Sequence, residues 1–251
     1  MLNHPTRDKL LTLRLLGMAG ALEEQRQLQA CDAMSFEERL GLLVDREMTQ
    51  RSNRQLAQRL KRARLRQSAV AEDIDFRQAR GLDRSLVQML LSCDWIRRHQ
   101  NCLITGPTGV GKSYLACALA NQACRAGWKV SYTRAPRLFQ ELAIARADGS
   151  FGRRLTSLAR TDLLLLDDWG LAPLAPEQAR DLLELLDDRY DRKSTLVVSQ
   201  LPVDSWHPMI GDGTLADASL DRLVHNAHRL VLTGESMRKT RAALTTQDSR
   251  E

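Results

Sequence analysis

Residues 102–113, which read CLITGPTGVGKS, constrain the fold of this chain more than any other segment. Leu103-Ile104-Thr105 predicts a buried strand, and the residues after 112 predict a helix, because their apolar positions repeat at helical spacing (Leu115, Ala116, Leu119, Ala120 and Ala123). Between the two lies Gly106-x-x-x-x-Gly111-Lys112-Ser113, the pattern of a phosphate-binding loop. Glycines let a backbone pass close to phosphate oxygens, and the amides at a helix start favour an anion. The segment therefore predicts a strand, a phosphate-binding loop and a helix.

The loop predicts a site for a nucleoside triphosphate and Mg²⁺. Lys112 would place a point charge on the β- and γ-phosphates, and Ser113 would give its hydroxyl to Mg²⁺. The predicted nucleotide-binding residues are those of the whole loop: Gly106, Pro107, Thr108, Gly109, Val110, Gly111, Lys112 and Ser113.

Two acids follow the leucine run 163–166 and predict the second part of the site. Four apolar residues in a row suit a strand covered on both faces, and a carboxylate at the end of such a strand lies on the ligand-binding edge. Asp167 would hold Mg²⁺ through water, and Asp168 would polarise the attacking water. Alone, the acids could equally be surface residues, but together with the loop they predict a hydrolytic site.

A third buried strand is predicted at 195–199, with Gln200 directly after it. In additional-strand P-loop ATPases, a strand inserted between the loop strand and the acidic strand carries a polar residue near the γ-phosphate. Gln200 matches that placement, and Ser199 is the alternative.

The order of elements predicts an α/β fold. Strands are expected at 102–105, 129–133, 163–167, 195–199 and 229–233, and helices at 82–96, 112–126, 136–146 and 176–190. Such alternation predicts a parallel five-stranded sheet with helices on both faces. The expected organisation is a helical N-terminal domain (1–66), a linker (67–80), the ATPase domain (81–238) and a flexible tail (239–251).

The N-terminal region is predicted to be all-helical. Leu11, Leu15, Met18 and Leu22 share one face of a helix, and residues 31–34 are the expected break. Ser35 and Glu38 have the spacing of a capping box that opens a second helix, running to Leu60 or beyond.

Positive charge is concentrated in the same region. The chain has a net charge of +6, and residues 46–66 carry eight Lys or Arg against one acid, Glu47. This imbalance predicts contact with nucleic acid, and the scarcity of aromatic residues favours the backbone of double-stranded DNA over stacked bases. The alternative is a solvated helix face. The candidate DNA-binding residues are Arg51, Arg54, Arg59, Lys61, Arg62 and Arg64.

Other classes of protein are disfavoured. The five cysteines lack metal-site spacing and are expected to be buried residues of a cytoplasmic protein. No stretch approaches the roughly 20 apolar residues of a membrane-spanning helix, and the N-terminus lacks a secretory apolar region, so no membrane association is expected.

Two arginines beyond the sheet are further candidates. Arg222 closes a short predicted helix, and from there it could reach the phosphates of a neighbouring subunit rather than its own, as an arginine finger. The spacing alone favours the alternative, a surface arginine paired with a helix acid. Arg238, after the last strand, is a weaker candidate for phosphate contact.

Several of these motifs together resemble the IstB family. They are GPTGVGKS, LLLLDDWG, DDRYDRKSTLVVSQLPVDSWH, LADASLDRLVHNAHRL and GESMR, with an N-terminal pattern of the same kind (LGMAGALEEQ). IstB-type proteins are AAA+ helper ATPases of insertion-sequence transposition, related to the DnaC helicase loaders.

This resemblance implies ATP and Mg²⁺ as ligands, homo-oligomers on double-stranded DNA with ATP sites between subunits, and a transposase as partner. It implies Gln200 as the γ-phosphate sensor, where Asn is commoner, and Arg222 as the trans finger. Many AAA+ proteins have Glu where this chain has Asp168, so slow hydrolysis is expected.

Three alternatives remain at this point. A helicase loader on single-stranded DNA would share the fold and the site. A DNA-binding structural protein with an inactive nucleotide site, and a small-molecule kinase, are less compatible with the intact loop and the basic helical region.

Overall fold

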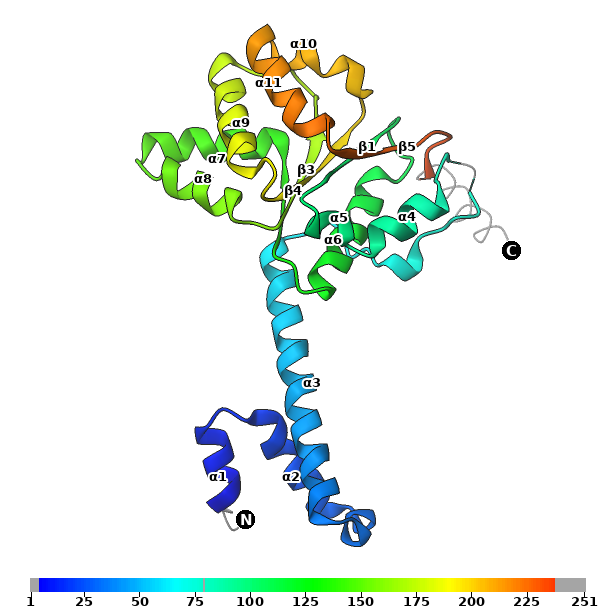
Figure 1. The fold of residues 1–251 in the computed structure, drawn as a ribbon, viewed down its shortest axis with the longest axis vertical. Helices are drawn as coiled ribbons and strands as arrows, with labels where there is room; N and C mark the ends of the chain where they lie inside the picture. Colours follow the sequence, from blue (N-terminus) through cyan, green and yellow to red (C-terminus); the bar gives the residue numbers. More distant parts are fainter. Residues whose placement is uncertain (1–4, 79, 238–251) are drawn as a thin grey trace, which may run out of the picture. The chain divides into compact units, whose positions relative to one another are not determined.

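The computed structural model describes residues 5–78 and 80–237, apart from the side chains of residues 30 and 32. The chain forms two compact units, Met1–Gln58 and Arg59–Glu251. The second unit contains the sheet and the phosphate-binding loop (Figure 1).

A five-stranded parallel sheet forms the centre of the second unit, as predicted. Its strands are β1 (Asn101–Thr105), β2 (Val130–Arg134), β3 (Leu163–Trp169), β4 (Ser194–Ser199) and β5 (Ala227–Val231). The spatial order is β2-β3-β4-β1-β5, so β4 lies between the loop strand β1 and the acidic strand β3. Leu103 of β1 is in register with Val197 of β4, and Leu164 of β3 with Thr195.

Helices cover both faces of the sheet (Figure 1). One face carries α6 (Lys112–Arg125) with α4 (Arg84–Leu91) and α5 (Asp94–Arg97); the other carries α7 (Ala135–Ala147), α8 (Phe151–Ala159), α9 (Pro176–Arg189), α10 (His207–Ile210) and α11 (Gly213–Val224). The reason is handedness. The chain moves outward from β1 to β2 and then returns toward β5, and right-handed crossovers in opposite directions place their helices on opposite faces.

The core lies in these two helix–sheet layers. All four leucines of β3, at 163–166, are fully buried, as a strand covered on both faces requires. Trp169 and Trp206 contact each other edge to face at 5.8 Å between ring centroids. The five cysteines are free and buried, as predicted, and burial raises the pKa of Cys124 to about 11.

Two helix predictions for this unit need correction. The single helix expected at 82–96 is wrong, because Cys93 takes a left-handed φ of 63° and separates α4 from α5. Helix α8 was not predicted, although its buried Leu155 and Leu158 occupy one side of the helix. Two short 3-10 helices, Ala71–Asp73 and Val203–Ser205, complete the unit.

The first unit is helical, as expected, but its first predicted helix is divided into two. Helix α1 (Pro5–Thr12) and helix α2 (Leu16–Gln27) replace the single predicted helix, because the chain turns at Arg14 with a φ of 59°. A 3-10 helix (Gln29–Ala33) leads to α3 (Phe36–Ala63), whose last five residues belong to the second unit. The capping box is confirmed: the Ser35 amide donates to Glu38 Oε2 at 2.8 Å, and the Glu38 amide to Ser35 Oγ at 3.3 Å.

Glu47 ties α2 to α3 within this unit. It is 6 % exposed, and its Oε2 accepts the amides of Gly17 at 2.7 Å and Met18 at 3.2 Å, which are free donors at the start of α2. Burial raises the pKa of Glu47, but the hydrogen bonds from Arg51 and from these amides outweigh burial and lower it. The carboxylate therefore stays charged where a helix N-terminus favours it.

We predict that two glycines of α2 respond in opposite ways to alanine. A Cβ at Gly17 would lie 2.6 Å from the Cα of Glu47, whereas a Cβ at Gly20 would meet nothing within 4 Å. Gly17→Ala should destabilise the first unit by about 1–3 kcal/mol through overpacking, and Gly20→Ala should stabilise it by about 0.5–1 kcal/mol. Native-state hydrogen exchange of α2 amides measures both changes. Equal effects of the two substitutions would refute this packing of α2 on α3.

Candidate phosphate-binding site

A pocket of about 560 Å³ opens at the carboxyl ends of β1, β3 and β4. Parallel α/β sheets bind ligands at this edge. The pocket is lined by residues of the loop, of strand ends and of the segment after α3: Thr108, Gly109, Gly111, Lys112, Ser113, Tyr114, Asp167, Asp168, Val198, Ser199, Gln200, Arg66, Gln67, Asp73, Asp75, Gln78, Arg80 and Met237.

The loop packs closely against the segment that follows β5, and two glycines permit this close approach. Gly106 has a φ of 142° and Gly109 a φ of 91°, and a Cβ at either position would lie 2.1 Å from the nearest atom of Leu232 or Ser236. Lys112 Nζ donates to Pro107 O at 2.7 Å, so the ammonium lies across the loop. Burial lowers the pKa of Lys112, and this effect is partly opposed by the two acids.

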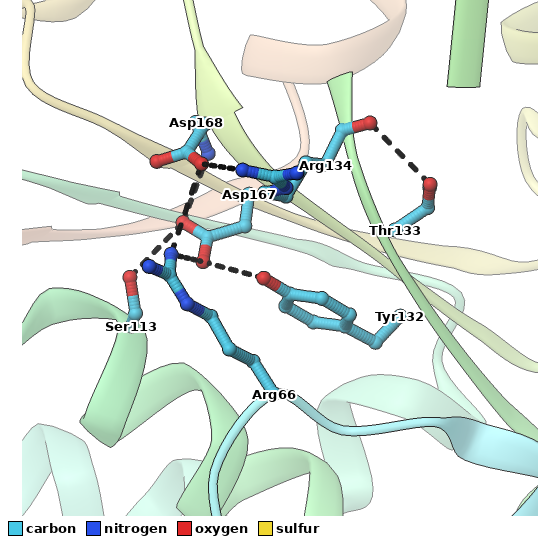
Figure 2. A network of polar contacts seen from close by, with 7 residues as sticks. All are labelled: Arg66, Ser113, Tyr132, Thr133, Arg134, Asp167 and Asp168. Carbon is cyan, nitrogen blue, oxygen red and sulfur yellow. Dashed lines mark hydrogen bonds and ion pairs between the residues drawn. The ribbon is translucent and has the colours of Figure 1, made fainter. Parts of the chain in front are cut away.

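Asp167 is the most enclosed charged residue that lines the pocket, with 1 % exposure. Its Oδ1 accepts the hydroxyl of Ser113 at 3.1 Å and the amide of Asp168 at 2.9 Å. Its Oδ2 accepts the hydroxyl of Tyr132 at 3.0 Å and lies 3.8 Å from the guanidinium of Arg66 (Figure 2). Tyr132 reaches it from the neighbouring strand β2, so the parallel register places this donor.

Asp167 and Asp168 lie within a bulge of β3. The strand does not end at 167 as predicted but continues to Trp169, and its register with β4 shifts between Leu166 and Trp169. Asp168 takes a left-handed φ of 57° within the bulge. Its carboxylate lies 3.7 Å from Arg66 Nη1 and 4.0 Å from Arg134 Nη1. The bulge thus turns Asp168 into the pocket beside Asp167.

The residues present fit Mg²⁺ and a triphosphate. The hydroxyl of Ser113 and the carboxylate of Asp167 are adjacent hard oxygens, and Mg²⁺ in phosphate-transfer sites binds one or two carboxylates together with substrate phosphates. The loop supplies helix-start amides and the ammonium of Lys112 on the same side.

Gln200 and Ser199 lie at the tip of β4 in different surroundings. Gln200 Oε1 accepts the hydroxyl of Thr108 at 2.8 Å and therefore contacts the loop. Ser199 is buried, donates to Trp169 O at 2.9 Å and accepts the amide of Leu201 at 3.0 Å. Both predicted sensor residues line the pocket, and the side chain of Gln200 hydrogen-bonds to the loop.

Arg222 lies at the opposite edge of the sheet. Its backbone carbonyl accepts Asn101 Nδ2 at 2.9 Å, and Asn101 is the first residue of β1. The four steps to the end of β1 span roughly 13 Å, so Arg222 is remote from its own loop. Its guanidinium ion-pairs with Asp187 of α9 and donates to Ala218 O at 2.7 Å. The pairing with a helix acid, which was the alternative for this residue, therefore occurs within the chain.

The remaining predicted residues are Arg238 and the six DNA-binding candidates, and the candidates differ in whether their side chains have partners within the chain. Arg238 lies outside the described residues. Arg51 pairs with Glu47 of the same helix at 2.6 Å, and Arg59 donates to Cys124 O at 2.8 Å and so joins α3 to α6. The other four DNA-binding candidates are exposed and make no ion pair or side-chain hydrogen bond in the described part of the chain: Arg54, Lys61, Arg62 and Arg64.

Sequence reasoning missed Arg66, Tyr132 and Arg134 as members of the acid network. Arg66 was counted only among the cations of the basic run, and Tyr132 and Arg134 were part of an unremarkable predicted strand. No local signal marks them, because their proximity to Asp167 depends on strand pairing and on the path of the chain after α3.

Over the described ranges, no helix is both long enough and apolar enough to cross a lipid bilayer.

Comparisons with known proteins agree with this geometry. The sequence profile of the IstB-like ATP binding proteins matches residues 8–245. The chain is 54 % identical over 239 residues to the insertion sequence ATP-binding protein y4pL of Sinorhizobium fredii, covering 95 % of this chain and 98 % of that protein.

Two solved structures share the fold at low sequence identity. DnaI has a TM-score of 0.56 and 21 % identity, covering 66 % of this chain and 92 % of DnaI. The replication initiator DnaA bound to AMPPCP and single-stranded DNA has a TM-score of 0.57 and 16 % identity, covering 75 % of this chain and 57 % of that chain. Over the matched part, the chain therefore shares the fold of DnaI and DnaA.

We predict that Asn101 fixes the edge of the sheet that carries Arg222. Its side chain also accepts the amide of Thr195 at 2.9 Å, so Asn101→Ala would leave one amide and two carbonyls of the interior without partners. The free energy of unfolding should fall by about 1–3 kcal/mol. Asn121→Ala is the control, because the Asn121 side-chain oxygen is buried without a partner among the described residues, and its change should stay within about 0.5 kcal/mol. Denaturant unfolding that shows equal losses would contradict this role of Asn101.

Proposed function

The chain belongs to the family of IstB-like ATP-binding proteins of insertion sequences, and on this premise we propose that it is an ATP-hydrolysing switch of DNA transposition. ATP favours assembly of copies of the chain on double-stranded DNA, the assembly engages a partner transposase, and hydrolysis releases it. The observation that carries the proposal is the joining of the loop, Ser113 and the paired acids Asp167 and Asp168 in one pocket.

Each residue of the pocket has a physical task in this proposal. The loop amides and Lys112 would bind the β- and γ-phosphates, and Gln200, which accepts the Thr108 hydroxyl of the loop, would sense the γ-phosphate. Ser113 and Asp167 would hold Mg²⁺, which would neutralise charge that develops on the phosphates. Asp168 accepts a proton from the attacking water as general base. Aspartate is one methylene shorter than the glutamate common at this position, so hydrolysis is slow.

Arg222 acts in the site of a neighbouring copy. The position of Arg222 at the far edge of the sheet supports this, because a side chain there cannot reach the loop of its own chain. A guanidinium contributed by a second copy stabilises charge on the transferred phosphoryl group, and it makes hydrolysis depend on assembly.

The proposed DNA contacts are made by exposed cations. Arg54, Lys61, Arg62 and Arg64 are available to phosphates, whereas Arg51 and Arg59 already hold other groups. The early part of α3 has a different character, because Phe36 is 77 % exposed and Met48 65 % exposed. Exposed apolar side chains of this size favour a protein partner over DNA in that part of the first unit.

We predict that Arg222→Ala binds ATP normally but loses DNA-stimulated hydrolysis, by a factor on the order of 10³. Lys112→Ala should lose ATP binding. A mixture of the two should regain hydrolysis, because a Lys112→Ala copy still offers its Arg222 to the intact loop of an Arg222→Ala copy. Phosphate release measures each case.

Asp187→Asn is the matched control, since it removes the intrachain partner of Arg222 and leaves the finger in place. Its stimulated hydrolysis should persist. Normal hydrolysis by Arg222→Ala, or a mixture no more active than its components, would exclude the shared site.

Strand preference separates the proposal from its alternative, a helicase loader on single-stranded DNA. With a non-hydrolysable ATP analogue and fixed salt, we predict tighter binding to a duplex than to a single strand of equal length. Replacing Arg62 and Arg64 by Gln should lower the slope of log affinity against log salt by about 2.

The control replaces Arg98 and Arg180 by Gln, which removes the same charge from exposed sites of the second unit. Fluorescence anisotropy measures all cases. Preference for the single strand would favour the helicase loader, and equal slopes for the two double variants would remove Arg62 and Arg64 from the interface.

A further inference from the structure

Arg66 places one guanidinium against both acids of the pocket. Its Nη1 lies 3.8 Å from Asp167 Oδ2 and 3.7 Å from Asp168 Oδ2. Figure 2 shows its side chain reaching up to the two carboxylates beside the ring of Tyr132. Among the ion pairs of residues 5–78 and 80–237, Arg66 is the one cation that contacts both carboxylates, because Arg134 contacts Asp168 alone.

The backbone that carries Arg66 is fixed to the loop helix. Burial raises the pKa of the Cys117 thiol, and the nearby backbone of Gln67 and Arg66 partly opposes this rise; Cys117 lies one turn after Ser113 on α6. Nearby Ala69 is fully buried. The segment between α3 and the pocket is therefore held against α6, and its side chain at 66 is directed at the acids by packed neighbours.

The acids require a cation at this place. Two adjacent carboxylates repel each other, and a carboxylate as enclosed as Asp167 is costly without a partner. The ammonium of Lys112 is bound to Pro107 O instead. Burial lowers the pKa of Arg66, but Tyr132 and the two acids outweigh burial and raise it, so the guanidinium keeps its charge.

Arg66 and Mg²⁺ would need the same carboxylate. The Ser113 hydroxyl and Asp167 Oδ1 are 3.1 Å apart and form the fitting ligand pair for Mg²⁺, while Arg66 neutralises the same side chain through Oδ2. A guanidinium and a divalent cation repel each other at such range. The Arg66 side chain is 43 % exposed and has an open path toward solvent.

We propose that Arg66 is the intramolecular counter-cation of Asp167 and Asp168 and that Mg²⁺-ATP displaces it, so that the segment joining the pocket to α3 responds to nucleotide. The inference rests on the proposed function, since it needs Mg²⁺ at Asp167. Arg66 lies three residues after Ala63, the last residue of α3, so its release acts directly on the end of that helix.

The test is the magnesium dependence of nucleotide binding. Arg66→Gln should reach half-saturation with a fluorescent ATP analogue at about two- to fivefold lower Mg²⁺ than the wild type, the range that a partly exposed ion pair supports. Arg66→Lys retains the charge and should stay near the wild type. Arg77→Gln is the matched control, because Arg77 is an exposed arginine of the same segment that does not line the pocket.

Hydrogen exchange of wild-type peptides covering 64–69 is the second readout, and it does not depend on any variant folding. Mg²⁺-ATP should increase their deuterium uptake, and in Arg66→Gln the uptake should already be high without nucleotide. Unchanged wild-type uptake in saturating Mg²⁺-ATP would overturn the inference.

The two proposals fail in distinguishable ways. A wild-type protein that binds no nucleotide at any Mg²⁺ concentration would overturn the proposed function and, with it, the inference. Wild-type binding with an unchanged or higher Mg²⁺ requirement in Arg66→Gln would overturn only the inference. Weaker nucleotide binding by Arg66→Gln at saturating Mg²⁺ would do the same, because it would make Arg66 a phosphate ligand.

Discussion

Two neighbouring carboxylates, Asp167 and Asp168, lie together at the end of β3, and their negative charge is stabilised by several groups of the pocket. Asp167 accepts two hydroxyls and an amide, and Arg66 bridges it to Asp168. Each of these groups comes from a different element. The two carboxylates at the end of β3 therefore contact α6, β2 and the segment after α3. The bulge that turns Asp168 inward has a backbone conformation that an L-residue rarely adopts, and such strain is typical of functional sites.

The length of the strands separates the phosphate-binding loop from Arg222. Phosphate-binding groups gather at the carboxyl ends, while Asn101 holds the end of α11, with Arg222, at the amino ends. A chain built this way cannot bring Arg222 to its own loop, and the proposed function therefore takes Arg222 from a second copy. Under that proposal, hydrolysis depends on assembly because a buried asparagine fixes the end of α11 at the amino ends of the strands.

Much of this architecture could be predicted from local patterns. The leucines of β3 and the glycines of the loop act through neighbours in sequence, and the predicted strand–loop–helix and five-stranded parallel sheet are confirmed. The breaks at Arg14 and Cys93 could not be predicted, because non-glycine residues seldom take positive φ and nothing nearby signals it. The same holds for Arg66, which looked like one more cation of a basic run. Its partner acids lie about 100 residues further along the chain, and only the three-dimensional fold brings them within 4 Å of its guanidinium.

The central claim is that the enclosed acids and the loop form a site for ATP with Mg²⁺. Calorimetric titration of the wild-type protein with a non-hydrolysable ATP analogue in saturating Mg²⁺ tests it most directly. The account predicts a saturable heat with one nucleotide bound per chain. Absence of any binding heat, with the protein folded, would contradict it.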